Sequence, residues 1–170
     1  NKVAARVVGT TSGNWYSTFT IDKGSNDGIE KDMNVIAGGG LVGIITEVGP
    51  NYAQIKTVIE DNSYVSGMLI DTGDTCIVKG DIELMDTGLI HLSGFANSVT
   101  VRNGDKIVTS NISEKFLPGL LIGYATDITV DYNDNLTKSG YVIPAARFDR
   151  LQEVLVITDL KNAGPEFNEQ

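Results

Sequence analysis

The chain has 170 residues and a net charge of −9, and its basic residues are scattered singly, which disfavours nucleic acid or an anionic lipid surface as the main partner. Nineteen glycines against four prolines favour short strands joined by tight turns over helices. The single cysteine, Cys76, excludes an internal disulfide, and its apolar neighbours predict a small buried side chain. No apolar run in the sequence approaches the length of a membrane span.

The first part of the chain alternates apolar and polar residues with the two-residue period of half-buried strands. Glycines in segments 24–28 and 38–40 separate these runs, because glycine tolerates the positive φ that a chain reversal demands. Gly67 interrupts the last run, where we expect a bulge or a barrel corner. The predicted strands are residues 2–8, 18–22, 33–36, 41–48, 53–59 and 64–70.

The second part of the chain continues with shorter runs and more turn residues. Residues 148–154 predict one turn of helix or an irregular corner before the last strand. Residues 161–170, rich in Gly, Pro, Asn and Glu, predict a disordered tail. The predicted strands are residues 75–78, 82–85, 89–92, 105–108, 121–128, 141–143 and 153–157.

One strand has an echo 80 residues later. Leu41-Val42-Gly43-Ile44-Ile45-Thr46-Glu47-Val48 resembles Leu121-Ile122-Gly123-Tyr124-Ala125-Thr126-Asp127-Ile128. Two similar β units in tandem are the simplest interpretation, and a chance match of short apolar strands is the alternative. We therefore expect an all-β chain with two small barrels, residues 1–70 and 71–160, because closure removes the exposed edges of such strands. Whether the last strand returns to the first barrel is left open.

Several segments together resemble the MreC family of rod shape-determining proteins, in the part of those proteins that lies outside the cytoplasm. The segments are 14–24, 27–29, 33–36, 40–43, 61–66 and 144–157. The resemblance covers nearly the whole chain and is weaker at 110–115, where the family more often has a glycine-rich turn. It implies two six-stranded barrels in tandem, similar in topology to those of trypsin-like proteases, with little helix.

The resemblance also implies a function and a cellular setting. Members of the family are non-catalytic scaffolds that organise and activate peptidoglycan synthesis by binding the class B penicillin-binding transpeptidase and by linking to MreD and the actin-like MreB. They form homodimers or filaments, and no cofactor is implied. The chain begins at Asn1 and not at methionine, which suggests an excised fragment. The resemblance implies that a short cytoplasmic tail, one transmembrane helix and a coiled coil precede it, with this domain on the extracytoplasmic side of the cell membrane.

Two Asp-Thr-Gly triplets, at Asp71 and Asp86, each follow two apolar residues, as in aspartic peptidases. That chemistry needs two carboxylates close enough to share a proton, one from each of two equivalent lobes or subunits. The triplets are 15 residues apart, too few to place one in each lobe, so a secreted peptidase would require a homodimer with one triplet per subunit. The alternative is turn chemistry at the end of an apolar strand, and we expect no enzyme activity.

No other catalytic or metal-binding set is evident in the sequence. His91 is the only histidine and no Gly-x-Ser-x-Gly motif accompanies it, so we interpret it as a structural or surface residue and not as a catalytic base. Zinc would have too few thiol and imidazole ligands. Residues 131–135 imitate the start of an EF-hand calcium loop, but Leu136 stands where that loop needs glycine and Val142 where it needs glutamate.

Without a catalytic set, recognition by the surface is the expected mechanism. Phe116 and Leu117, in an expected exposed loop, are the candidate partner contacts, and the alternative is that they plug the end of the second barrel. A module that binds cell-wall glycan is the third function considered. One tryptophan and no evident aromatic platform argue against it.

Overall fold

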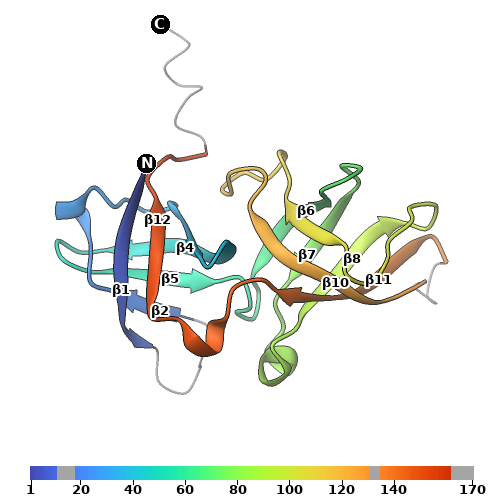
Figure 1. Cartoon of the computed structure of the whole chain (residues 1–170), viewed down its shortest axis with the longest axis horizontal. Coiled ribbons are helices and arrows are strands. Elements are labelled where there is room, and N and C mark those ends of the chain that lie inside the picture. Colours follow the sequence, from blue (N-terminus) through green and yellow to red (C-terminus); the bar gives the residue numbers. More distant parts are fainter. Residues whose placement is uncertain (11–17, 131–134, 162–170) are drawn as a thin grey trace, which may run out of the picture.

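The computed structural model describes residues 1–10, 18–130 and 135–161, which form two closed barrels of antiparallel strands (Figure 1). The predicted all-β class with two six-stranded barrels is confirmed. The strands are β1 (Lys2–Thr10), β2 (Thr18–Ile21), β3 (Asn34–Ala37), β4 (Gly40–Val48), β5 (Ala53–Thr57), β6 (Tyr64–Leu69), β7 (Thr75–Lys79), β8 (Ile90–Ala96), β9 (Lys106–Thr109), β10 (Leu121–Val130), β11 (Thr137–Pro144) and β12 (Glu153–Ile157). Three short 3-10 turns accompany them in the described ranges: η1 (Ser25–Asp27), η2 (Ile82–Thr87) and η3 (Phe148–Arg150).

The two barrels share one topology but exchange their closing strands. The hydrogen-bonded order around the first barrel is β1-β12-β3-β4-β5-β2, and around the second it is β7-β6-β9-β10-β11-β8. Strands β1 to β5 therefore correspond to β7 to β11, and β12 takes in the first barrel the position that β6 takes in the second. The first barrel consists of β1–β5 and is closed by β12, which follows β11 in the chain. The second consists of β7–β11 and is closed by β6, which follows β5. In Figure 1, β12 accordingly lies beside β1 although the two come from opposite ends of the chain.

The expected domain boundary at residue 70 is one strand too late, because the observed boundary lies between β5 and β6. β6 pairs with β7 and β9, so the chain has already left the first barrel after β5. β12 pairs with β1 and β3, which is the return to the first barrel that the sequence left open. The second barrel is therefore one continuous segment of the chain, from β6 to β11, whereas the first is discontinuous, because β12 from the end of the chain completes β1–β5.

The echoed sequence corresponds to β4 and β10, which occupy equivalent positions in the two barrels. Both strands carry a register shift immediately before the glycine of the motif, opposite β3 in one barrel and β9 in the other. A Cβ atom at Gly43 would collide with the carbonyl oxygen of Lys56, and one at Gly123 would collide with that of Ile143. Only glycine permits the neighbouring strand to approach this closely, so the echo reflects a constraint that both barrels share.

One predicted strand is wrong, because residues 82–87 form η2 and not an extended run over 82–85. Polar side chains at its two ends favour the turn. The carboxylate of Asp81 accepts the N–H of Glu83 at 2.9 Å, and the hydroxyl of Thr87 donates to the carbonyl of Leu84 at 2.6 Å. Such local bonds to the backbone compete with a sheet ladder. The helical turn predicted near residue 148 is present as η3.

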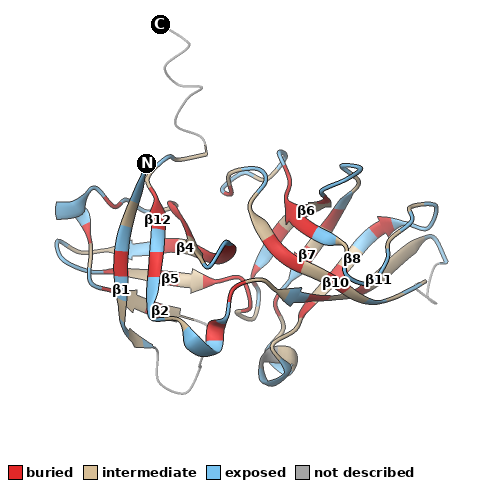
Figure 2. Ribbon diagram, viewed as in Figure 1, coloured by how far each residue is buried: buried red, intermediate tan, exposed pale blue. Residues whose placement is uncertain are grey.

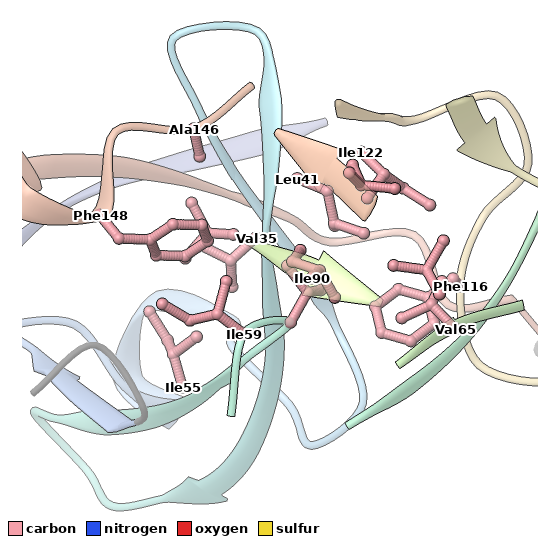
Figure 3. Close-up of a cluster of buried hydrophobic side chains, with 14 of the residues drawn as sticks. Val35, Leu41, Ile55, Ile59, Val65, Ile90, Phe116, Ile122, Ala146 and Phe148 are labelled. Carbon is pink, nitrogen blue, oxygen red and sulfur yellow. The ribbon is translucent and has the colours of Figure 1, made fainter. Parts of the chain in front are cut away.

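A single hydrophobic cluster runs through both barrels and across their junction (Figures 2 and 3). Leu41 of β4 and Ile122 of β10 are fully buried members of it, and these two strands are in contact. Figure 3 shows the cluster continuing from Phe148 and Ile59 on one side of the junction to Phe116 on the other. A shared apolar core of this kind disfavours independent motion of the two barrels, so the surfaces on either side of the junction are held in fixed relation.

Candidate partner-binding surface

The loop that joins β9 to β10, residues 110–120, carries the two predicted partner contacts and is ordered by buried hydroxyl groups at its base. The hydroxyl of Thr109 donates to the carbonyl of Leu117 at 2.6 Å and accepts the N–H of Leu120 at 2.8 Å. The hydroxyl of Ser110 lies 2.9 Å from that of a serine in β6. Thr109 and Ser110 are both fully buried. The loop is therefore built into the second barrel and is not a free apex.

Asn34 of β3 fastens this loop to the first barrel. Its side chain is 1% exposed, its Nδ2 donates to the carbonyl of Lys115 at 3.0 Å, and its Oδ1 accepts the N–H of Leu117 at 2.8 Å. Lys115 also forms an ion pair of 3.6 Å with Asp32, which contributes little because both groups are exposed. A buried amide that satisfies a donor and an acceptor of the loop backbone makes the loop part of the junction between the barrels.

The expectation that Phe116 is exposed is wrong. Its side chain is 8% exposed and belongs to the same buried cluster as Val65 (Figure 3). The residues on either side of it are both bonded to Asn34, which holds this part of the loop against the first barrel with the ring inside the cluster. Leu117 is half-buried, and its contact with a partner stays a prediction. Ile112 of the same loop is a large apolar side chain that is exposed, at 67%.

A cleft of about 330 Å³ lies at the junction of the barrels, between η2 and η3. Figure 1 shows these turns on the same side of the molecule, η2 in yellow-green and η3 in orange. The residues that line the cleft are Ile59, Asp86, Thr87, Gly88, Ile143, Pro144, Ala146, Arg147, Phe148 and Asp149. The guanidinium of Arg147 donates two hydrogen bonds of 3.3 Å to the carboxylate of Asp149, and these bonds lower the pKa of Asp149 below its ordinary value. Within the described part of the chain, the carboxylate of Asp86 has no hydrogen bond or ion pair.

The two Asp-Thr-Gly triplets do not form a pair of catalytic carboxylates within this chain. Asp71 and Asp86 are both exposed, and they line separate hollows that share no residue. Each triplet ends in a glycine at positive φ, 79° at Gly73 and 74° at Gly88. The turn interpretation therefore accounts for both triplets, because each reverses the chain after an apolar segment.

His91 and Cys76 both have structural surroundings. His91 Nε2 lies 2.9 Å from a carboxylate oxygen of Asp81, and its ring lies against that of Tyr141 with centroids 5.4 Å apart. The N–H of Glu83 and, after it, the His91 hydrogen bond lower the pKa of Asp81. Cys76 is buried, and burial raises the pKa of its thiol to about 12, so the reactive thiolate is suppressed.

No group of three or more His, Cys, Asp or Glu side chains suited to a metal ion occurs in the described ranges. Within the same ranges no helix is long and apolar enough to cross a membrane. The segment considered for calcium, residues 131–135, lies outside these ranges except for Asn135. The start of the family-like sequence before Thr18, with Trp15, and the predicted tail after Lys161 lie outside them as well.

Comparison with known proteins identifies the family. The model described as rod shape-determining protein MreC, barrel core, matches residues 7–158. This chain belongs to the MreC family. The cell shape-determining protein MreC of Listeria monocytogenes is 28% identical over 162 residues, which are 94% of this chain and 54% of the relative. That of Bacillus subtilis is 31% identical over 164 residues, 91% of this chain and 56% of the relative. The chain thus spans about half the length of the curated MreC proteins it matches.

Solved MreC structures share the fold of this chain. MreC from Pseudomonas aeruginosa superposes with a TM-score of 0.82 at 22% identity, covering 92% of this chain and 99% of that one. The major periplasmic domain of the cell shape-determining filament MreC gives a TM-score of 0.74 at 20% identity, covering 92% and 94%. MreC in a complex with the penicillin-binding protein PBP2 from Helicobacter pylori gives 0.66 at 12% identity, covering 94% and 100%. The family is one of non-catalytic, cell shape-determining proteins.

Neither the role of Asn34 nor the cleft was predicted from the sequence. Asn34 had a signal, because it is a polar residue between Met33 and Val35 at the start of an apolar strand, and a polar side chain that becomes buried needs a partner. The cleft had no signal, since η2 and η3 lie far apart in the sequence and meet only when both barrels are closed.

Proposed function

We propose that this chain is the extracytoplasmic barrel domain of a non-catalytic scaffold in the bacterial cell-elongation machinery, where it organises and activates peptidoglycan synthesis through protein contacts. The observation that carries this proposal is the match to the MreC barrel core over residues 7–158. The shared core of the two barrels supports it, because a rigid module presents surfaces in fixed relation to a partner.

The proposed partner is a class B penicillin-binding transpeptidase. The support is that a Helicobacter pylori MreC with the same fold was solved in a complex with the penicillin-binding protein PBP2. Binding of the scaffold would activate the enzyme if the scaffold had higher affinity for the active conformation. We place MreD and MreB in the same assembly on the strength of the family resemblance alone.

We further propose that one transmembrane helix ahead of this domain anchors it to the cell membrane and that the domain forms homodimers or filaments. A relative described as a filament, whose major periplasmic domain has this fold, supports self-association. Sedimentation of the purified domain over a range of concentrations tests this part: a rising average mass supports self-association, and a constant monomer mass contradicts it.

The central test is direct binding between purified proteins. The domain is immobilised and titrated with the extracytoplasmic part of the class B transpeptidase from the same organism, with an unrelated acidic barrel protein as the control surface. We expect saturable binding to the domain alone and faster peptide cross-linking when the domain is added. Absence of saturable binding to the folded domain would contradict the proposal. Retention on purified cell-wall sacculi without the transpeptidase would instead favour the glycan-binding alternative.

A further inference from the structure

The cleft between η2 and η3 combines an apolar wall with an unpaired carboxylate. Phe148 and Ile59 form buried parts of the wall, and Ile143 is 47% exposed at its edge. Asp86 lies on the lip, exposed and without an ion pair in the described part of the chain. Exposed apolar surface that adjoins a single unpaired charge is suited to a side chain with an apolar stem and a charged end.

The charged residues of the cleft determine whether the charged end of such a side chain should be cationic or anionic. Arg147 and Asp149 satisfy each other through two hydrogen bonds, so this pair contributes no net charge. The remaining charged group among the lining residues is Asp86, which gives the lining a net charge of −1; Arg150, whose Nε lies 3.9 Å from the Asp149 carboxylate, is not part of the lining. An anionic occupant would be repelled, whereas a lysine or arginine would gain a partner for its charge.

The size and rigidity of the cleft also limit its occupant. Its volume of about 330 Å³ is at the lower end of the range for small-ligand pockets, roughly 300–1,000 Å³, so it has room for a side chain and its neighbours but not for a large cofactor. Its walls come from the second barrel and from the two connections between the barrels, and they join the shared core through Ile59, Ala146 and Phe148. The cleft is therefore formed before any partner binds, and little conformational entropy is lost on binding.

We propose that this cleft receives a lysine or arginine side chain of the transpeptidase, with its aliphatic stem on Ile143 and Phe148 and its cationic end at Asp86. The inference rests on the proposed function and names the part of the domain that serves it. The second Asp-Thr-Gly triplet then has a role in recognition, because its turn holds Asp86 at the lip of the cleft.

The test measures the dissociation constant between the transpeptidase and four variants of the full chain. Asp86→Asn removes the charge, and Asp71→Asn is its matched control, since it makes the same change in the other exposed triplet outside the cleft. We expect Asp86→Asn to weaken binding roughly threefold to tenfold and Asp71→Asn to leave it unchanged. Ile143→Ser tests the apolar wall against Val8→Ser, because both residues are exposed on strands and only Ile143 lines the cleft. We expect only Ile143→Ser to weaken binding.

The outcomes separate this inference from the proposed function. If the unmodified chain binds the transpeptidase and Asp86→Asn binds as tightly as Asp71→Asn, the inference fails while the proposed function stands. If the unmodified chain does not bind, the proposed function itself fails. If Asp86→Asn changes only self-association, the occupant is a second copy of the chain and the inference is overturned. If the dissociation constants of Asp86→Asn and Asp71→Asn differ less at high salt than at low salt, the inference is supported, because screening weakens the interaction of exposed charges. Thermal unfolding at the same temperature in all variants excludes loss of fold as the cause.

Discussion

Removal of the Asn34 side chain tests the attachment of the β9–β10 loop to the first barrel. Asn34→Ala deletes the acceptor of the Leu117 N–H and the donor to the Lys115 carbonyl, at a site where the native side chain is 1% exposed. Each backbone group left without a partner costs about 1–3 kcal/mol when it stays buried. Because the carbonyl has a second lone pair and the new space admits some relaxation, we expect a loss of about 2–4 kcal/mol in the free energy of unfolding.

Urea denaturation of purified protein measures this loss, and Asn51→Ala is the control. Asn51 accepts a hydrogen bond of 2.9 Å from Asn26 on the exposed surface, so the same substitution there should change the free energy of unfolding by less than about 0.5 kcal/mol. For a chain of this size the Asn34 variant should unfold about 4–16 °C lower in a thermal scan. Hydrogen exchange provides a local readout, because the amide of Leu117 should lose its protection in Asn34→Ala only.

Equal unfolding free energies for Asn34→Ala and Asn51→Ala would refute the reasoning. So would a Leu117 amide that remains as protected as in the unmodified protein. Either result would mean that the loop is held by its own hydroxyl groups and by Phe116 alone, without the amide of β3.

Four further predictions follow from packing and burial. Gly43→Ala forces β4 away from the adjacent strand and should lower the free energy of unfolding by about 1–3 kcal/mol in urea, and an unchanged midpoint would contradict this. Phe116→Ala should cost about 3–5 kcal/mol, whereas Ile112→Ser in the same loop should cost less than about 0.5 kcal/mol; similar values would show that the ring is not a core residue. Cys76 should resist a thiol reagent at pH 8 in the folded protein and react once the chain is unfolded in urea, and rapid labelling of the folded protein would disprove its burial. A fragment of residues 1–61 should remain unfolded by circular dichroism because it lacks β12, and a cooperative thermal transition would show that five strands suffice.

The class of the fold and most of its strands could be predicted because they depend on local sequence. The two-residue alternation along β5 shows directly in its burial, with Ala53, Ile55 and Thr57 buried between half-exposed residues. The echo of β4 in β10 could also be read, because both copies need a glycine where a neighbouring carbonyl approaches. The one mistaken strand, now η2, failed because side-chain bonds to the backbone outweighed the preference of its apolar residues for an extended conformation.

The candidate site was predictable only in part. Phe116 and Leu117 could be selected as candidate contacts because they are an apolar pair in an expected loop. The sequence does not indicate that Asn34 binds the backbone on either side of the Phe116 ring. Burial of Phe116 thus depends on a residue of the other barrel. The position of Asp86 on a cleft lip likewise depends on η3, which the sequence does not relate to it.

By itself the sequence determined that this chain is an all-β pair of similar units, because alternation, glycine turns and the echo are properties of neighbouring residues. Only the tertiary structure decided that the units exchange β6 and β12, and with that exchange the junction, the cleft and the burial of Phe116. The physical reason is that the hydrogen bonds between strands join backbone N–H and C=O groups, and every residue except proline has both. Many strands of suitable length could therefore close a given barrel. The choice among them is made by the side chains that pack across the closed barrels and their junction.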